Sequence, residues 1–291
     1  MATIIAVAGA TGNLGGKIVA ALLSRGAGVR ALVRPGTSDE KRQKLEGVEI
    51  LEVDPRSVAE LTEALRGASC VVSALAGLRE VIVDAQSTLL DAAIAAGLPR
   101  FIPSDYSIDF TKLPEGENRN LDLRREFHQK LDEAPIASTS ILNGAFMEML
   151  LGGMPLLDRE RKTVSYWENP DQRLDFTTMD DTAAFTAAAA LDSSTPKTLR
   201  IAGDSISASE LAKAAGLDFK LVRLGSLEDL AEMIQQARSG DTQGENELYP
   251  RWQGMEYLHG MFGGRAKLEP LDNDRYSDLG WTRVKDLLAG Q

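Results

Sequence analysis

At 291 residues, the chain is long enough for one large α/β unit, or for a large domain with a smaller lobe. Its formal net charge of −11 argues against direct nucleic-acid binding, which needs a basic face. A single cysteine, Cys70, excludes an internal disulfide framework, and two histidines without paired spacing, His128 and His259, argue against a metal site. Neither a membrane span nor a signal peptide is apparent, so we expect a cytoplasmic protein that contacts no membrane.

The first stretch of the chain predicts a strand–turn–helix unit that binds a dinucleotide. An apolar run over 3–8 predicts a buried strand, and apolar residues at helical spacing follow from Ile18. Gly9, Gly12 and Gly15 stand between them. The first glycine permits a sharp turn, the second a close approach of a pyrophosphate, and the third close packing of the helix on the sheet. This G-x-x-G-x-x-G spacing is a variant of the usual fingerprint, in the context that the motif requires.

Strand and helix patterns continue to alternate after this unit. Further elements are predicted at 29–33, 48–53, 57–65, 69–74, 81–96, 101–102, 121–133 and 136–142. Alternation of this kind is typical of an α/β fold with a doubly wound parallel sheet. Such a sheet binds ligands at the carboxyl ends of its strands, so we expect six separate segments to converge on one crevice.

The pattern loosens after about Gly152. Short strands are predicted at 163–167, 174–176, 199–202 and 221–224, with helices at 208–214 and 227–238. An alanine-rich helix begins near Met179, with Asp180 as its expected N-cap. Six aromatic residues then occupy a tail without strong periodicity, at 249, 252, 257, 262, 276 and 281. They form either a satellite core or an aromatic wall over the crevice, suited to a flat apolar ligand.

The residue that ends the second strand indicates which dinucleotide binds. An acidic residue there would hold the ribose of NAD, whereas an arginine suits the 2′-phosphate of NADP. The sequence has Arg34 at this position, with Lys44 among the basic residues that follow. We therefore expect NADP(H), the alternative being that Arg34 is a solvated surface residue.

At this point the sequence resembles the NmrA-like, isoflavone-reductase-like group of atypical short-chain dehydrogenases. The motifs that carry the resemblance are G-A-T-G-N-L-G (9–15), L-V-R (32–34), D-A-A-I-A-A-G-L-P-R-F-I-P-S-D-Y (91–106), T-S-I-L-N-G-A-F-M-E (139–148) and F-T-T-M-D-D-T-A-A-F (176–185). The resemblance implies a Rossmann-type NADP-binding domain over 1–152, its sheet completed by segments up to about 203. A small α+β substrate lobe would occupy mainly 153–291.

The resemblance also implies roles for individual residues. The pyrophosphate would lie against Gly9, Thr11, Gly12, Asn13, Leu14 and Gly15. Arg34 and Lys44 would hold the 2′-phosphate. The path from adenosine to nicotinamide would be lined by Ala74, Leu75, Pro103, Asn143, Ala145 and Phe146.

The proton donor is where the chain departs from the family. The family's phenylpropanoid reductases carry a lysine at the position that aligns with Leu123 or Arg124 here, and a Y-x-x-x-K pair is also missing. Arg124 is too weak an acid to give up a proton, but it is able to stabilise a developing oxyanion. Tyr106 is either the donor or a packed loop tyrosine, and water is a third source.

Two functions follow from the resemblance. The first is an NADPH-dependent reductase of a small aromatic, quinonoid or conjugated carbonyl compound, with hydride transfer from the nicotinamide. The alternative is a non-catalytic NADP(H)-binding sensor with a protein partner. The sequence specifies no oligomeric state.

Overall fold

The computed structural model describes residues 3–290. Its main feature is a parallel six-stranded sheet in the order β3-β2-β1-β4-β5-β6, which confirms the predicted doubly wound fold. The strands are β1 (Ile4–Ala8), β2 (Gly28–Val33), β3 (Glu49–Glu52), β4 (Cys70–Ser73), β5 (Arg100–Ile102) and β6 (Ala137–Ser138). The strand order reverses between β1 and β4, which is where a sheet of this type opens a binding crevice.

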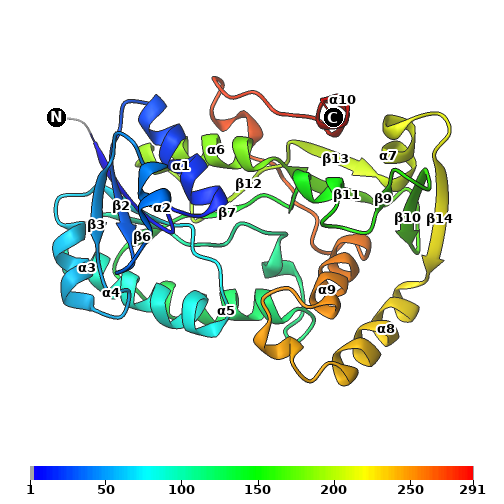
Figure 1. Cartoon of the computed structure of the whole chain (residues 1–291), viewed down its shortest axis with the longest axis horizontal. Helices are drawn as coiled ribbons and strands as arrows, with labels where there is room; N and C mark the ends of the chain where they lie inside the picture. Colours follow the sequence, from blue (N-terminus) through cyan, green and yellow to red (C-terminus); the bar gives the residue numbers. More distant parts are fainter. Residues whose placement is uncertain (1–2, 291) are drawn as a thin grey trace.

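Helices cover both faces of this sheet (Figure 1). One face carries α1 (Asn13–Ser24) and α6 (Met179–Leu191), and the other carries α3 (Val58–Leu65), α4 (Gln86–Ala95) and α5 (Arg119–Leu131). The central strands β1 and β4 are buried along almost their whole length because each face is packed under helices. The short helix α2 (Asp39–Gln43) follows β2 and has no buried residue. No helix among residues 3–290 is both long and apolar enough to cross a membrane.

The strand predicted at 136–142 is divided at Thr139. Its first part is β6, and its second part is β7 (Ser140–Leu142), which pairs in parallel with β12 (Thr198–Arg200). A segment from the second half of the chain therefore lies beside the first-half strands. The boundary near residue 152 stays a prediction.

Two details of the helices differ from expectation. The helix predicted at 81–96 begins as a π-helical turn over Glu80–Ala85 before α4. The N-cap of α6 is Thr178 rather than Asp180: the Thr178 hydroxyl accepts the Asp181 N–H at 3.0 Å. Asp180 instead pairs with Lys17 of α1 at 2.6 Å, on an exposed surface.

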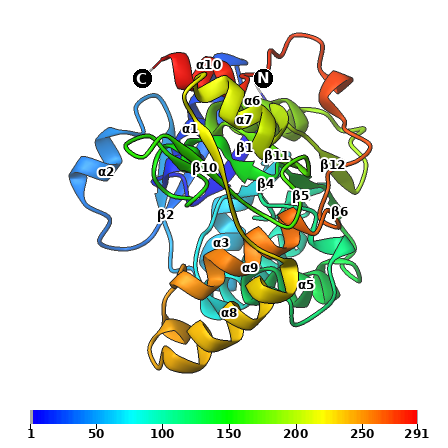
Figure 2. The same ribbon diagram turned by 90° about the vertical axis from the view of Figure 1, so that its right-hand side faces the viewer.

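The other elements of the second half of the chain form a smaller α+β lobe (Figures 1 and 2). One three-stranded sheet contains β9 (Leu157–Asp158), β10 (Thr163–Trp167) and β14 (Lys220–Gly225). The other contains β8 (Ala145–Phe146), β11 (Arg173–Thr177) and β13 (Asp204–Ser207). Around them lie α7 (Ala208–Ala215), α8 (Leu227–Gly240), α9 (Arg251–Phe262) and α10 (Val284–Ala289). Their apolar side chains form a core separate from the two that flank the main sheet.

The aromatic tail does not form a single wall. Trp252 and Phe262 belong to α9 and are buried in the lobe, whereas Tyr276 and Trp281 pack on Phe185 of α6 across the molecule. The sequence did not reveal α9 because this helix contains two glycines and is buried on most of its sides. A helix enclosed in this way lacks the polar stripe that makes a helix visible in a sequence.

Candidate active site

The glycine turn after β1 brings backbone against backbone. Gly9 has φ +80°, and a Cβ there would lie 2.5 Å from the carbonyl oxygen of Ala74. The Gly12 N–H donates to the Gly9 carbonyl at 2.9 Å, and no side chain caps the N-terminus of α1. Gly12 and Asn13 are exposed, and Thr11 and Leu14 are half-buried. An exposed helix N-terminus without a capping side chain fits a pyrophosphate, since its N–H groups and its dipole both favour an anion.

Hydrogen bonds connect the ends of neighbouring strands. The Ala74 N–H donates to the Ala8 carbonyl at 2.8 Å, which links β4 to β1. The Ser104 hydroxyl, next to Pro103, donates to the Leu75 carbonyl at 2.6 Å, which links β5 to β4. These bonds connect the ends of the three strands at the carboxyl edge of the sheet, where Ala74 and Leu75 are half-buried and Pro103 is buried.

Asn143 lies at the end of β7 with an amide that has no partner. The side chain is fully buried, and neither Oδ1 nor Nδ2 is hydrogen-bonded within residues 3–290. The backbone is fixed, since the N–H groups of Asn143 and Gly144 both donate to the Ser107 carbonyl, at 3.0 and 3.1 Å. A buried amide without a partner is costly unless a ligand completes its hydrogen bonds, so Asn143 fits the role of a cofactor contact. The half-buried Ala145 and Phe146 follow directly in β8.

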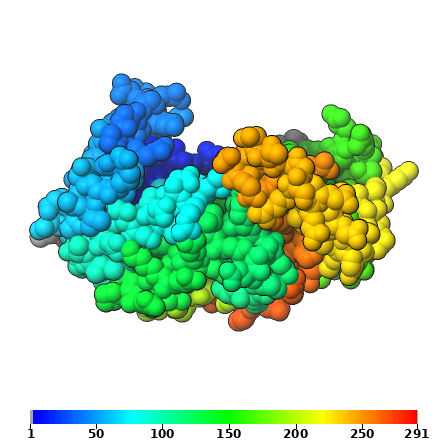
Figure 3. Space-filling model, turned by 90° about the horizontal axis from the view of Figure 1, so that it is seen from below, coloured from blue at the N-terminus to red at the C-terminus, as the bar shows by residue number. Residues whose placement is uncertain are grey.

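A cleft is visible over this edge of the sheet in the space-filling view (Figure 3). One wall is the blue segment around α2, and the opposite wall is the orange connector between α8 and α9. Dark blue N-terminal atoms lie at the bottom of the cleft between them. The cleft therefore lies between the Rossmann-type sheet and the smaller lobe.

The two residues assigned to the 2′-phosphate lie in different surroundings. Arg34 ends β2 and its side chain is exposed, while its carbonyl accepts the Thr37 hydroxyl at 2.7 Å. Lys44 is also exposed, but its ammonium pairs with Glu40 one turn earlier, at 3.1 Å. Arg34 is thus the more available cation, although both assignments stay predictions.

Tyr106 is buried in the core rather than exposed in the cleft. Its side chain is 7% exposed and packs in the core between the sheet and helices α1 and α6. Burial raises the pKa of its hydroxyl, which lies near Thr186 but makes no hydrogen bond of normal geometry within the described chain. This placement favours the packed loop tyrosine over the donor role.

Arg124 lies on α5 and carries a charge that no described carboxylate neutralises. Its Nη1 donates to the Asn120 carbonyl one turn earlier at 2.8 Å, and its buried Nε has no partner in the described chain. The next residue differs, because Arg125 pairs with Asp122 at 2.5 Å. Arg124 is therefore a partly buried cation with a free donor, the kind of group that stabilises a developing negative charge.

Tyr257 of α9 is half-buried against the core of the smaller lobe, and sequence reasoning did not single it out. Burial raises the pKa of the Tyr257 hydroxyl, while the Arg124 charge and the side chains of Asn120 and Ser107 lower it. Ser107 is the residue whose carbonyl holds Asn143. The only sequence signal for Tyr257 is its membership in the aromatic tail, because the helix that positions it was not predicted.

One turn after Arg124, His128 fixes α5 to the sheet. Its Nε2 lies 2.6 Å from Oδ2 of the fully buried Asp105, which also accepts the Ser140 hydroxyl at 2.7 Å. Burial lowers the pKa of His128, but the charges and hydrogen bonds of Asp105 and Asp132 together raise it by more, so the net direction is upward. No group of His, Cys, Asp and Glu among residues 3–290 has the arrangement of a metal site.

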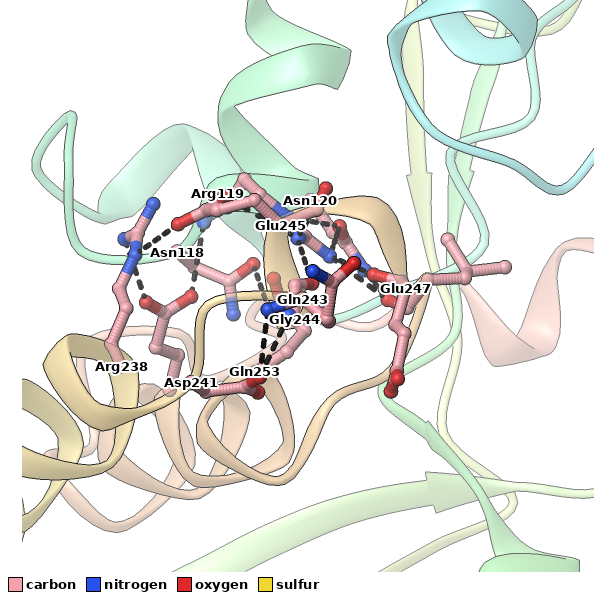
Figure 4. A network of polar contacts seen from close by, with 12 residues as sticks. Asn118, Arg119, Asn120, Arg238, Asp241, Gln243, Gly244, Glu245, Glu247 and Gln253 are labelled. Carbon is pink, nitrogen blue, oxygen red and sulfur yellow. Dashed lines mark hydrogen bonds and ion pairs between the residues drawn. The ribbon is translucent and has the colours of Figure 1, made fainter.

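The first residues of α5 bind the connector that forms one wall of the cleft (Figure 4). The Arg119 guanidinium donates to the carbonyls of Gly244, Glu245, Glu247 and Leu248, at 2.8–3.3 Å. Asn120 adds a bond from its Nδ2 to the Leu248 carbonyl at 2.9 Å. Arg119 and Arg238 both lie over the Trp252 ring, with their Cζ atoms 4.6 and 4.5 Å from its centroid. The guanidinium of Arg119 and the ring of Trp252 thus hold the connector in place.

A buried carboxylate completes this network. Glu256 is 3% exposed; its Oε2 accepts the Arg119 N–H at 3.1 Å, and its Oε1 lies 3.3 Å from Arg238 Nη1. Burial raises the pKa of Glu256 to about 7, against the lowering effects of the two arginines.

Comparisons with known proteins agree with this architecture. Pinoresinol reductase 1 of Arabidopsis thaliana is 30% identical over 214 residues, which are 68% of this chain and 66% of that protein, just under two thirds of its length. An isoflavone reductase homologue of Zea mays is 39% identical over 113 residues, or 36% of each chain.

Solved structures share the fold over nearly the whole chain. AtPrR2 with NADP+ and (+)pinoresinol has a TM-score of 0.81 at 22% identity, covering 99% of this chain and 98% of that one. The NADPH-dependent quinone oxidoreductase of Escherichia coli has a TM-score of 0.74 at 21% identity, covering 98% of each chain. The NmrA-like family matches residues 1–219, which include every motif that carried the resemblance. The chain therefore belongs to the NmrA-like family.

Proposed function

We propose that this protein is an NADPH-dependent reductase of a small aromatic, quinonoid or conjugated carbonyl compound. The cofactor site follows the carboxyl edge of the sheet. The pyrophosphate lies at the N-terminus of α1, the 2′-phosphate at Arg34, and the nicotinamide toward Asn143, Ala145 and Phe146. Three features support this placement: the backbone cradle at Gly9–Gly15, the uncapped helix, and the amide of Asn143 without a partner.

The observation that carries the proposal is the cation at Arg124. Bound NADPH supplies a hydride, and a carbonyl or quinone substrate that accepts the hydride gains negative charge on its oxygen. A guanidinium is a cation with five N–H donors, and the Nε of Arg124 has no partner within the described residues. A fixed positive charge in a partly buried site lowers the energy of such an oxyanion more than an exposed one would.

The substrate class is supported by the relatives. The similar proteins named above are a pinoresinol reductase, an isoflavone reductase homologue and a quinone oxidoreductase. Each of these names refers to a reductase, so the comparisons support the enzyme and not the sensor. The buried Cys70 in β4 is compatible with a reducing compartment, and the cytoplasm stays our expectation for the location.

The test combines binding with turnover. NADPH affinity is measured by fluorescence titration, and NADPH oxidation is followed with a panel of quinones, enals and lignans such as pinoresinol. Arg124→Leu is expected to lower kcat about 100-fold with NADPH affinity unchanged, and Arg124→Lys to retain part of the activity. If NADPH binds tightly but no compound in the panel is reduced, the reductase proposal fails and the sensor takes its place.

A further inference from the structure

The buried carboxylate of Asp105 connects three segments of the chain through one oxygen. Its Oδ2 lies 2.6 Å from Nε2 of His128 on α5 and accepts the hydroxyl of Ser140 on β7 at 2.7 Å. Asp105 itself belongs to the loop after β5, where its backbone N–H donates to the Pro103 carbonyl at 2.9 Å. The loop, the helix and the strand are therefore held together at a single buried atom.

The same three segments hold residues of the candidate site. Arg124 lies one turn before His128 on α5, and Asn143 directly follows β7. In the loop, the Ser107 carbonyl accepts the backbone N–H of Asn143 at 3.0 Å. A shift of the loop relative to the helix or the strand would therefore move the Asn143 amide and the Arg124 guanidinium relative to each other.

The carboxylate of Asp105 needs a cation, and His128 supplies it. Asp105 is fully buried, and its other oxygen, Oδ1, has no hydrogen-bond partner in the described chain. Within residues 3–290, His128 is the one basic residue within ion-pair distance of this carboxylate. The rings of Phe110 and Phe127 pack edge-on against the imidazole, with centroids 5.6 and 6.3 Å away. A buried carboxylate is costly unless a cation pairs with it, so this site favours a protonated imidazole.

We propose that Asp105 and His128 are a pair of positioning residues, and that NADPH binding and reduction both depend on the positive charge of His128. The pair acts through Asn143, whose amide it places for the cofactor, and through Arg124, whose guanidinium it places for the substrate oxygen. The inference rests on the proposed function for these two roles. When the imidazole loses its proton, the Asp105 carboxylate stays buried without a cation, and the connection between the loop and α5 weakens.

The surroundings of His128 agree with this role. Burial lowers its pKa, but the carboxylates of Asp105 and Asp132 together raise it by more, so the pKa lies above 6.5. Asp132 lies 3.7 Å from the imidazole Nδ1 and pairs with Lys197 at 2.8 Å. Tyr106, next to Asp105 in the chain, also feels the charge of that carboxylate. The stabilising contribution of the pair is therefore fully present below pH 6.5 and is lost as the pH rises through the raised pKa of His128.

The first experiment needs no turnover. The chain has two histidines, so a comparison of imidazole NMR signals in the wild type and His128→Gln identifies His128. Its titration is recorded with and without saturating NADPH, and the NADPH dissociation constant is measured across the same pH range. Linkage requires the two results to agree: an affinity loss of about ten-fold on deprotonation corresponds to a titration about one pH unit higher in the complex. We expect an effect of about this size. A His128 titration that NADPH leaves unchanged would overturn the inference.

The second experiment separates the charge from the hydrogen bond. His128→Gln leaves the buried Asp105 carboxylate beside a neutral donor, and we expect NADPH binding about ten-fold weaker and a lower kcat with a quinone. The double variant Asp105→Asn with His128→Gln replaces the ion pair by two neutral amides. It is expected to regain stability and affinity relative to His128→Gln, and to lose the pH dependence of both NADPH affinity and kcat. His259→Gln changes the half-buried histidine of α9 and is the matched control, which should keep the pH dependence of the wild type.

The outcomes distinguish this inference from the proposed function. If the wild type loses stability as His128 loses its proton but binds NADPH equally well, the pair has a purely structural role and the inference fails. A kcat that stays constant at saturating NADPH through the same titration would contradict the role of Arg124. If NADPH binds with the expected pH dependence but no compound in the panel is reduced, the reductase proposal fails and the positioning of Asn143 stands.

Discussion

A Cβ on Gly15 would lie 2.1 Å from the carbonyl oxygen of Gly9. Helix α1 therefore packs against the preceding turn backbone to backbone, with no side chain between them. We expect Gly15→Ala to push α1 away from β1, to destabilise the fold by about 3 kcal/mol and to weaken NADPH binding at least ten-fold. Chemical denaturation and NADPH titration measure the two effects.

Gly16→Ala is the matched control for this variant. A Cβ on Gly16 would lie 3.5 Å from the nearest atom, the Ala10 carbonyl oxygen, which is an ordinary contact. This variant is expected to bind NADPH as the wild type does. Equal NADPH affinities for the two variants would show that the close packing at Gly15 does not shape the cofactor site.

The choice of dinucleotide is expected to depend on Arg34 rather than on Lys44. Arg34→Ala should weaken NADPH binding about ten-fold or more and leave NADH binding unchanged, because only NADPH carries the 2′-phosphate. Lys44→Ala should have a smaller effect, since Lys44 is exposed and already pairs with Glu40. Dissociation constants for both dinucleotides test this, and a wild type that binds NADH as tightly as NADPH contradicts it.

Tyr106→Phe is expected to change neither the activity nor the stability of the protein much. The Tyr106 hydroxyl lies in an apolar core without a hydrogen bond of normal geometry in the described chain, so its removal costs little. We expect kcat to stay within about two-fold of the wild type and the free energy of unfolding to change by less than about 1 kcal/mol. A large loss of kcat with intact stability would restore Tyr106 as the proton donor.

Glu256 is expected to make stability depend on pH. Its pKa is raised from 4.5 to about 7 in the folded protein, so the fold favours the protonated acid. That contribution is fully present below pH 4.5 and is lost as the pH rises to about 7, because the unfolded chain gives up the proton first. The groups that face Glu256 are Arg119, Arg238 and Asp122.

Glu256→Gln isolates this effect, since the amide oxygen still accepts the Arg119 N–H. Between pH 4.5 and about 7, the wild type should lose about 3 kcal/mol of unfolding free energy more than this variant does. Urea denaturation across this range measures the difference, with the exposed Glu247→Gln as the control. Parallel stability profiles for the wild type and Glu256→Gln would contradict the prediction.

The sequence determined most of the cofactor half of this protein, because that half depends on local rules. Apolar runs predicted the parallel strands, and three glycines at fixed spacing predicted a turn in which a Cβ at Gly9 or Gly15 would lie 2.5 Å or less from a carbonyl oxygen. The motifs up to Phe185 were enough to identify the family, which the match over residues 1–219 confirms. Local chemistry of this kind lies within a few residues in the chain and is therefore visible without the fold.

The catalytic half was decided by tertiary structure. Tyr106 follows a strand end, yet the fold turns its ring into the core beneath the sheet. Glu256 comes from a helix with two glycines and no polar stripe, and its partner Arg119 lies 137 positions earlier. The bond between Arg119 and Glu256, with those from the Arg119 guanidinium to the connector, holds α9 and its connector against α5. No local pattern records such a contact, since it is made by packing between segments that are distant in the chain.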